Sequence, residues 1–573
     1  MLGAIFGLLN LALFKDFSGV LEQIPLGPTG DLGYATYQGN QPYPNAVDSR
    51  TTVDLGYVTY QGKLDEEYPN TVVYFGIRYA EPPVGYRRFR ATVPLDTARV
   101  TEQANGEVID ATEPPNFCIQ GSLNPLQPGG AGSEDCLHVN IYTPLDAKER
   151  GNLPVMVFIH GGAFLFGNPL AWPFEHWIEQ SQEVIIVSVY YRLASFGFLA
   201  VPEFTNSTYG DFNVGLKDQR EALRWVQSNI GKFGGNPNEV TVAGHSAGAI
   251  STELHMTVNE RGPLFSRAIV QSVVRSPLPT PEQQRPLFEF YAAEAKCSTG
   301  SVEQKMDCLR NADISELSVA QEAAFLNFAL EYRAFSPIVD GVLITGHPTT
   351  KFQGGDFAHV PLLIGTTSNE TLAPELFYQT IPRALKGTFP LLTATDIEEF
   401  LQQYPLDDFD SSSHQYQVAT GESTARCTPQ AMGIPSSRYV NETWTYRYNT
   451  PIPPNKFDEI PVEHADEIWM MFRGTYNGPN GTFAFDPQTA VERAFASELI
   501  AYWLSFVRTS NPNTYKLPKS PVWKTYNEPS PVRMVLMQEP YSTIMSGSYM
   551  EKQPALETTR CEFVISKAEV CQN

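Results

Sequence analysis

From about residue 140 onward, short apolar runs alternate with longer polar or amphipathic segments, and this alternation constrains the fold more than any other feature of the chain. The runs VNIYTP, LPVMVFIH and VIIVSVYYR predict strands, and residues 217–233 (KDQREALRWVQSNIGKF) carry apolar residues at helical spacing. The later runs SRAIVQSVV, HVPLLIGTT and ETWTYRYNT are separated by polar or helical segments. Alternating strands and helices predict an α/β fold, a large and mostly parallel twisted sheet with helices on both faces. In such sheets, chemistry occurs at the carboxyl ends of the strands.

One predicted strand, the short buried run NEVTVAGHS, leads into the pentapeptide GHSAG at residues 244–248, and a predicted helix follows. A G-x-S-x-G match alone is weak evidence, because Gly and Ser are common residues. A nucleophilic serine, however, needs a strained turn between a strand and a helix, with small neighbours that let the backbone pass closely. The context therefore predicts Ser246 as a nucleophile; the alternative is an ordinary glycine-rich turn.

A second motif, HGGAF at residues 160–164, follows the predicted strand LPVMVFI. Its small residues leave successive backbone N–H groups free to stabilise a developing oxyanion. We predict Gly162, Ala163 and Ala247 as the three donors. The alternative is a glycine pair that serves only a tight turn, and the order of the two motifs along the chain disfavours it.

A serine hydroxyl needs a base, and the base needs an acid that holds its tautomer. In a fold of this kind the chain order is Ser, acid, His. His464 lies just before an apolar helix and is the predicted base, whereas the alternative, His414, lies in a polar loop. Glu370 lies just past the strand HVPLLIGTT and is the predicted acid. Asp340, between two apolar runs, is the alternative, and its position is more typical of a turn.

Composition excludes several classes of partner. The formal net charge is −23 and no Lys/Arg-rich run interrupts it, so nucleic acid and anionic membrane surfaces are unlikely partners on electrostatic grounds. None of the seven cysteines forms a CxxC pair, and no Cys/His cluster has zinc spacing. Disulfides are therefore favoured over a metal site, and we expect neither a metal nor a cofactor.

The beginning of the chain carries a possible export signal and a repeat. The apolar run Leu2–Phe14 has the length of a signal-peptide core, although it lacks a preceding basic residue and a clear cleavage site. We predict a signal peptide over residues 1–18, with a buried terminal helix or a misplaced start as alternatives. DLGYATYQGNQPYPNAV from Asp31 is echoed by DLGYVTYQGKLDEEYPNTV from Asp54, so residues 31–53 are interpreted as a partial duplicate.

Asn-x-Ser/Thr sequons fit an exported protein, and no later stretch resembles a transmembrane segment. We therefore expect a secreted protein without a stable membrane anchor. The predicted glycosylation sites are Asn206, Asn441 and Asn480, and a further sequon lies at Asn369.

Together these motifs resemble the type-B carboxylesterases and lipases, the cholinesterase-like branch of the α/β-hydrolases, especially secreted fungal members. The similarity covers about residues 54–563 through FGIRYAEPPVGYRRF, SEDCLHVNIY, HGGAF, YYRLASFGFL, NVGLKDQREALRWVQSNIGKFGGNP, GHSAG and the Glu370 and His464 segments. The resemblance implies one α/β-hydrolase domain over residues 54–565. It also implies a carboxylic ester hydrolase that uses a Ser-His-Glu triad and an acyl-enzyme.

The resemblance also implies disulfides and internal ion pairs. The implied disulfides are Cys118–Cys136, Cys297–Cys308 and Cys427–Cys561, which leave Cys571 over. The implied ion pairs are Arg88–Glu134 and Arg192–Asp218.

Two features depart from the family pattern. The loop between Cys118 and Cys136 contains no aromatic residue, whereas cholinesterases carry there the Trp that stacks on a quaternary ammonium. His245 precedes the serine where many relatives have Glu. Neutral esters or lipids are therefore the expected substrates, with Phe164 and Phe166 as pocket walls or core residues. The alternatives are a noncatalytic adhesion protein and an acyltransferase.

Overall fold

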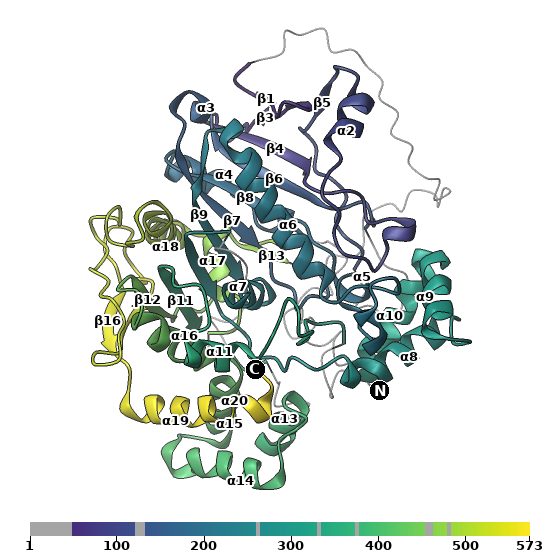
Figure 1. Cartoon of the computed structure of the whole chain (residues 1–573). Helices are drawn as coiled ribbons and strands as arrows, with labels where there is room; N and C mark the ends of the chain where they lie inside the picture. Colours follow the sequence, from purple (N-terminus) through teal and green to yellow (C-terminus); the bar gives the residue numbers. More distant parts are fainter. Residues whose placement is uncertain are drawn as a thin grey trace, which may run out of the picture.

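The computed structural model describes residues 49–120, 132–258, 264–328, 334–372, 378–452, 462–477 and 483–573. Its main element is an 11-stranded sheet (Figure 1). In spatial order the strands are β16 (Tyr549–Lys552), β15 (Val532–Leu536), β12 (Thr443–Tyr448), β11 (Leu362–Thr367), β10 (Arg267–Gln271), β9 (Gly235–His245), β7 (Leu153–Ile159), β8 (Ile185–Val189), β6 (His138–Pro144), β4 (Thr71–Arg78) and β3 (Lys63–Leu64). The strands from β15 to β8 run parallel, and the outer strands at both sides pair antiparallel. The predicted mostly parallel sheet is confirmed.

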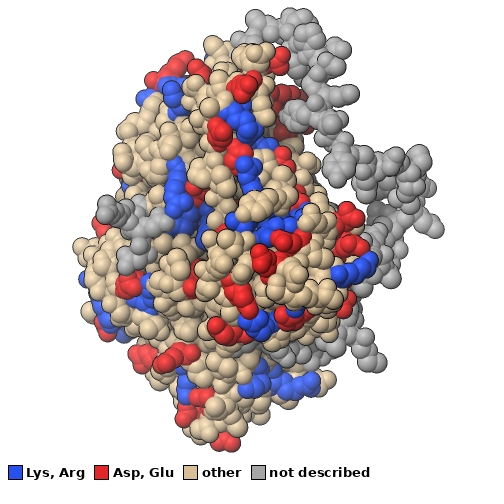
Figure 2. Space-filling model, turned by 45° about the vertical axis from the view of Figure 1, so that its right-hand side comes forward, with Lys and Arg blue, Asp and Glu red and all other residues tan. Residues whose placement is uncertain are grey.

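Charged side chains of both signs occur close to one another on the surface. On the face shown in Figure 2, Lys and Arg side chains lie among Asp and Glu side chains, although acidic residues outnumber basic ones in the whole chain. Like-charge repulsion is therefore partly offset locally, while the net charge still repels polyanions.

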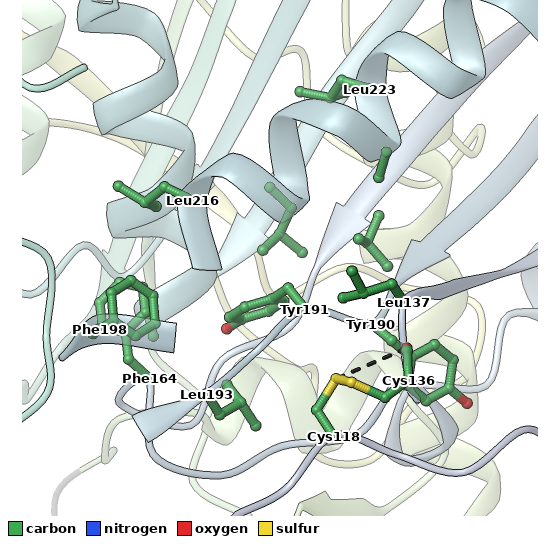
Figure 3. Packing of buried hydrophobic residues seen from close by; sticks show 14 of the residues in the cluster. Cys118, Cys136, Leu137, Phe164, Tyr190, Tyr191, Leu193, Phe198, Leu216 and Leu223 are labelled. Carbon is green, nitrogen blue, oxygen red and sulfur yellow. Dashed lines mark hydrogen bonds between the residues drawn. A yellow bond between two sulfur atoms is a disulfide. The ribbon is translucent and has the colours of Figure 1, made fainter. Parts of the chain in front are cut away.

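Helices cover both faces of the sheet, which is why the central strands are apolar on both sides. In β7, Val155 and Val157 pack into one core while Met156 and Phe158 pack into the other, as the alternation of a strand requires. Figure 3 shows part of the first core, where α6 lies beside the segment that follows β8. Helices α6 (Val214–Asn229) and α7 (Ala247–Thr257) line this first core, and α4 (Glu175–Gln180) and α18 (Ala490–Thr509) line the second.

The second copy of the sequence repeat enters the fold. Strand β1 (Thr52–Asp54) pairs with β2 (Thr59–Gln61), which also pairs with β5 (Val108–Asp110) in a small sheet beside the main one. The chain then continues into β3 and β4. The first copy, from Asp31, and the predicted signal peptide lie outside the described residues.

Disulfides and buried ion pairs connect distant segments. Arg88 forms a bidentate pair with Glu134 at 2.6 and 2.8 Å, and the Arg192 Nη2 atom lies 2.7 Å from the Asp218 Oδ1 atom. Such buried pairs fix geometry more than they add stability. The three disulfides are the ones that the resemblance implies, Cys118–Cys136, Cys297–Cys308 and Cys427–Cys561, and Cys571 is a buried thiol.

Across the described parts of the chain, none of the helices is both long and apolar enough to cross a membrane.

Candidate active site

Ser246 occupies the sharp turn between strand β9 and helix α7. Its backbone has φ 55° and ψ −119°, a conformation that non-glycine residues rarely adopt and that requires support from the surrounding structure. Its N–H donates a 2.9 Å hydrogen bond to the carbonyl of Gln271, at the end of the neighbouring strand β10. The strand, turn and helix arrangement is therefore present as the motif predicts.

The glycines on either side of Ser246 let the backbone segments pass closely. A Cβ atom on Gly248 would lie 1.9 Å from the carbonyl oxygen of Ile159, and one on Gly244 would lie 2.2 Å from the carbonyl oxygen of Gly248. Real Cβ atoms do not approach backbone this closely. The small residues thus serve the packing of α7 against β7, and this packing holds the serine at the edge of the sheet.

The structure brings Ser246, His464 and Glu370 together. The Nε2 atom of His464 lies 2.9 Å from the Oγ atom of Ser246, and its Nδ1 atom lies 2.5 Å from the Oε2 atom of Glu370. The three residues follow β9, β12 and β11 respectively, so they meet at the carboxyl edge of the parallel strands. This is the geometry of a serine nucleophile with a base and an orienting acid.

Glu370 is fully buried, yet it is held in its ionised form. Burial raises its pKa, but the attraction of His464 and the hydrogen bond from that ring outweigh this effect, so the pKa lies below its usual range. Its Oε1 atom accepts a 2.8 Å hydrogen bond from the N–H of Thr367, which also favours the carboxylate. An ionised Glu370 favours the tautomer in which Nδ1 carries the proton and Nε2 is free to accept the serine proton.

The alternative acid and base lie elsewhere. The Oδ1 atom of Asp340 accepts the N–H groups of residues 342–344, and its Oδ2 atom accepts a 2.8 Å hydrogen bond from the Asn213 Nδ2 atom. Asp340 is therefore the turn residue that its sequence position indicates. His414 is half-exposed and its nearest acidic partner is Asp410, at 3.6 Å. Neither alternative meets the serine.

The HGGAF segment passes directly beside the nucleophile. A Cβ atom on Gly161 would lie 3.1 Å from the Cβ atom of Ser246. Gly162 and Ala163 have φ values of 116° and 57°, and their N–H groups donate no hydrogen bond to any described residue. Ala247 is the first residue of α7, so its N–H also lacks a partner within the helix, at the end where the helix dipole favours negative charge. Of the three predicted donors, Ala247 directly follows the serine in the chain, and Gly162 and Ala163 directly follow Gly161, which lies beside it.

Phe164 lies in the core. Its side chain is buried and packs edge-on against Phe198 with 5.0 Å between ring centroids, so core packing accounts for it. Phe166 is half-buried against the same core. Of the two residues considered for a pocket wall, only Phe166 has a partly exposed side chain.

Two buried groups beside the triad were not assigned a role from the sequence. The ring of His245 lies 5.0 Å from that of His464, and burial together with that neighbouring ring lowers its pKa well below the usual range, so it is neutral. Burial raises the pKa of Glu467 to about 8, and its Oε1 atom accepts hydrogen bonds from the Tyr446 hydroxyl and the Gln271 amide, at 3.0 and 3.3 Å. In the sequence, Glu467 is distinguished only as the acidic residue that begins the otherwise apolar run EIWMMF, three positions after His464.

No group of three or more His, Cys, Asp or Glu side chains that could hold a metal ion occurs within the ranges that the structure describes.

Comparisons with known proteins agree with this geometry. The model of the carboxylesterase family matches residues 50–564. Acetylcholinesterase of Danio rerio is 29% identical over 513 residues, covering 78% of this chain and 77% of that protein. Acylcarnitine hydrolase of Mus musculus is 30% identical over 481 residues, covering 78% of this chain and 81% of that protein. The crystal structure of Aspergillus niger EstA superposes with a TM-score of 0.78 at 28% identity, covering 91% of this chain and 99% of that one. The chain therefore belongs to the carboxylesterase family and is a carboxylic ester hydrolase with the α/β-hydrolase fold.

Proposed function

We propose that the protein hydrolyses neutral carboxylic esters through an acyl-enzyme on Ser246. The 2.9 Å contact between the His464 Nε2 atom and the Ser246 Oγ atom is the observation that carries this proposal. His464 takes the serine proton as Oγ attacks the ester carbonyl, and the resulting tetrahedral intermediate expels the alcohol, which receives that proton. Water then attacks the acyl carbonyl with His464 again as base, and the acid and free serine are released.

The N–H groups of Gly162, Ala163 and Ala247 supply the electrostatic part of this mechanism. The N–H groups of Gly162 and Ala163 have no hydrogen-bond acceptor among the described residues, which leaves them available to a developing oxyanion, and each donor of this kind typically contributes about 10²- to 10³-fold to the rate. A noncatalytic role would not need a base within hydrogen-bond distance of a strained serine.

Covalent labelling tests the nucleophile. We expect a fluorophosphonate probe to modify the peptide that contains Ser246, since loss of fluoride leaves the phosphonyl group on Oγ. His464→Ala should slow labelling strongly, because the base is lost, whereas His414→Ala should label as fast as the wild type. Modification of a different residue, with the Ser246 peptide unmodified, would reject the assignment.

The preference for neutral esters rests on the missing aromatic platform. A quaternary ammonium group loses its hydration when it enters a pocket, and contacts with aromatic faces compensate for this loss by roughly 0.5 to 2 kcal/mol of binding free energy each. The sequence between Cys118 and Cys136 contains no aromatic residue. Residues 121–131 of that loop lie outside the described residues. The two relatives above are named for different esters, so family membership alone does not select a substrate. We expect kcat/KM for butyrylthiocholine to exceed that for a neutral thioester of the same acyl length by less than tenfold. A larger ratio would contradict this proposal.

We also propose that the protein is exported and glycosylated. Asn206 and Asn441 are exposed, as an acceptor must be, and the three disulfides fit an oxidising compartment. Asn480 and the predicted signal peptide lie outside the described residues. Enzymatic removal of N-glycans from the secreted protein should lower its mass, and an unchanged mass would contradict glycosylation.

A further inference from the structure

The loop between β15 and β16 exposes apolar side chains at its tip. Tyr541 is 93% exposed, Ile544 81% and Met545 60%. Exposed apolar residues that occur singly are ordinary, but three within five positions form a patch. No charged residue occurs from residue 540 to 550, in a chain whose net charge is −23.

Hydrogen bonds fix the conformation of this tip. The Ser542 Oγ atom accepts the N–H groups of Ile544 and Met545, at 3.3 and 3.1 Å. The Lys519 Nζ atom donates a 3.0 Å hydrogen bond to the carbonyl of Thr543. The apolar side chains are therefore presented by an organised turn, so little ordering is needed when they enter an apolar phase.

The tip belongs to the same edge of the sheet as the triad. Strand β15 runs parallel to β12, so its carboxyl end lies at the edge where Ser246 is held. The carbonyl of Leu536 accepts the N–H of Asn449 at 2.9 Å, and the N–H of Gln538 donates to the Thr450 Oγ1 atom at 2.8 Å. Residues 449 and 450 begin the segment that leads from β12 to His464. The loop is thus joined to the chain that carries the proposed base.

We propose that residues 540–545 insert into the surface of an uncharged lipid aggregate and hold the enzyme there with its active-site edge towards the lipid. A short convex tip of Tyr, Ile and Met fits a disordered interface that can deform around it. The net negative charge of the chain and the absence of charged residues from 540 to 550 disfavour an anionic surface as the preferred partner. The functional consequence, attack on aggregated esters, rests on the proposed function, whereas adsorption itself requires no catalysis.

Vesicle flotation tests this inference on the full chain. We expect the wild type, and equally Ser246→Ala, to float with neutral phosphatidylcholine vesicles. The double variant Ile544→Ser, Met545→Ser should bind at least tenfold less while hydrolysing a soluble monomeric ester at the wild-type rate. Val342→Ser is the matched control, because Val342 is 84% exposed but lies in a different turn, and it should float like the wild type.

Three results would overturn the proposal. Wild type that stays in the soluble fraction, or a double variant that floats as well as the wild type, would show that the tip does not hold the protein on lipid. A wild-type dimer that the double variant dissociates, without vesicle binding by either protein, would show that a second copy of this chain covers the patch. Binding by Ser246→Ala separates adsorption from hydrolysis, so failure of one is distinguishable from failure of the other.

Discussion

At the residue scale, Glu370 determines how His464 can act. Its Oε2 atom accepts a hydrogen bond from the Nδ1–H group of His464, with 2.5 Å between Nδ1 and Oε2, and this leaves Nε2 facing the serine. In Glu370→Gln, the amide can donate to Nδ1 and so favour the wrong tautomer. We expect kcat to fall on the order of 10³- to 10⁴-fold with little change in KM, measured with a neutral ester.

Asp340→Asn is the control, because Asp340 was the alternative acid and instead holds a turn. It should keep kcat within about twofold of the wild type, since the acid of the triad is untouched. Equal losses in both variants would contradict the assignment of Glu370.

Glu467 provides a pH test of the buried network beside the triad. Because burial raises its pKa to about 8, the folded protein keeps a proton on Glu467 that the unfolded chain releases near pH 4.5. Between these two pH values the folded form therefore binds more protons than the unfolded chain. The contribution of the protonated Glu467 to the free energy of unfolding is lost as the pH rises towards 8. The neutral variant Glu467→Gln lacks this dependence.

We expect urea unfolding at pH 5, 6, 7 and 8 to show that the free energy of unfolding of Glu467→Gln, relative to that of the wild type, rises by roughly 1 kcal/mol for each pH unit. A constant difference between the two proteins across this range would show that Glu467 does not hold a proton in the folded state.

At the element scale, the contact of helix α7 with strand β7 depends on Gly248. A methyl group there would need the space of the Ile159 carbonyl oxygen, 1.9 Å away, and the three nearest atoms are all backbone atoms of Ile159 and His160, which cannot rotate away as a side chain can. We expect Gly248→Ala to lower the free energy of unfolding by about 2 kcal/mol or more, and to reduce activity because Ser246 moves with the helix.

The matched control is Gly354→Ala at the end of helix α11 (Pro348–Gly354), where an added Cβ atom would meet nothing within 4 Å. Its stability should be unchanged or higher by up to about 1 kcal/mol. Thermal unfolding of both variants checks the comparison. A similar effect at both positions would mean that the close contact is unimportant.

The elements themselves were largely predictable, because strands buried on both faces must be continuous apolar runs. Strands β7, β8, β10, β11 and β12 lie where such runs occur.

The boundaries of the helices were less predictable. The helix expected over residues 217–233 begins at Val214 and gives way at Ile230 to a 3₁₀ turn that contains Gly231. Asn213, in the left-handed conformation, sets the earlier start, and its side chain bonds to Ile338 and Asp340, contacts that no local pattern contains.

At the scale of the whole molecule, the site is assembled from distant segments. Ser246 and His464 are separated by 218 positions, yet the order of parallel strands places them at one edge. Chain order together with local context predicted Ser246, Glu370 and His464 as a group, and the structure brings these three side chains into contact. The burial of Glu467 was not predictable, because it arises where separate strands and helices converge around the triad.

The turnover of purified Ser246→Ala with p-nitrophenyl butyrate shows whether Ser246 carries the acyl group. The variant loses the hydroxyl oxygen that forms the acyl-enzyme but keeps every hydrogen bond of its backbone. We predict that kcat/KM falls at least about 10⁴-fold while the thermal unfolding midpoint stays close to that of the wild type. A folded Ser246→Ala protein that retains more than a few per cent of wild-type turnover would show that a different group is the nucleophile.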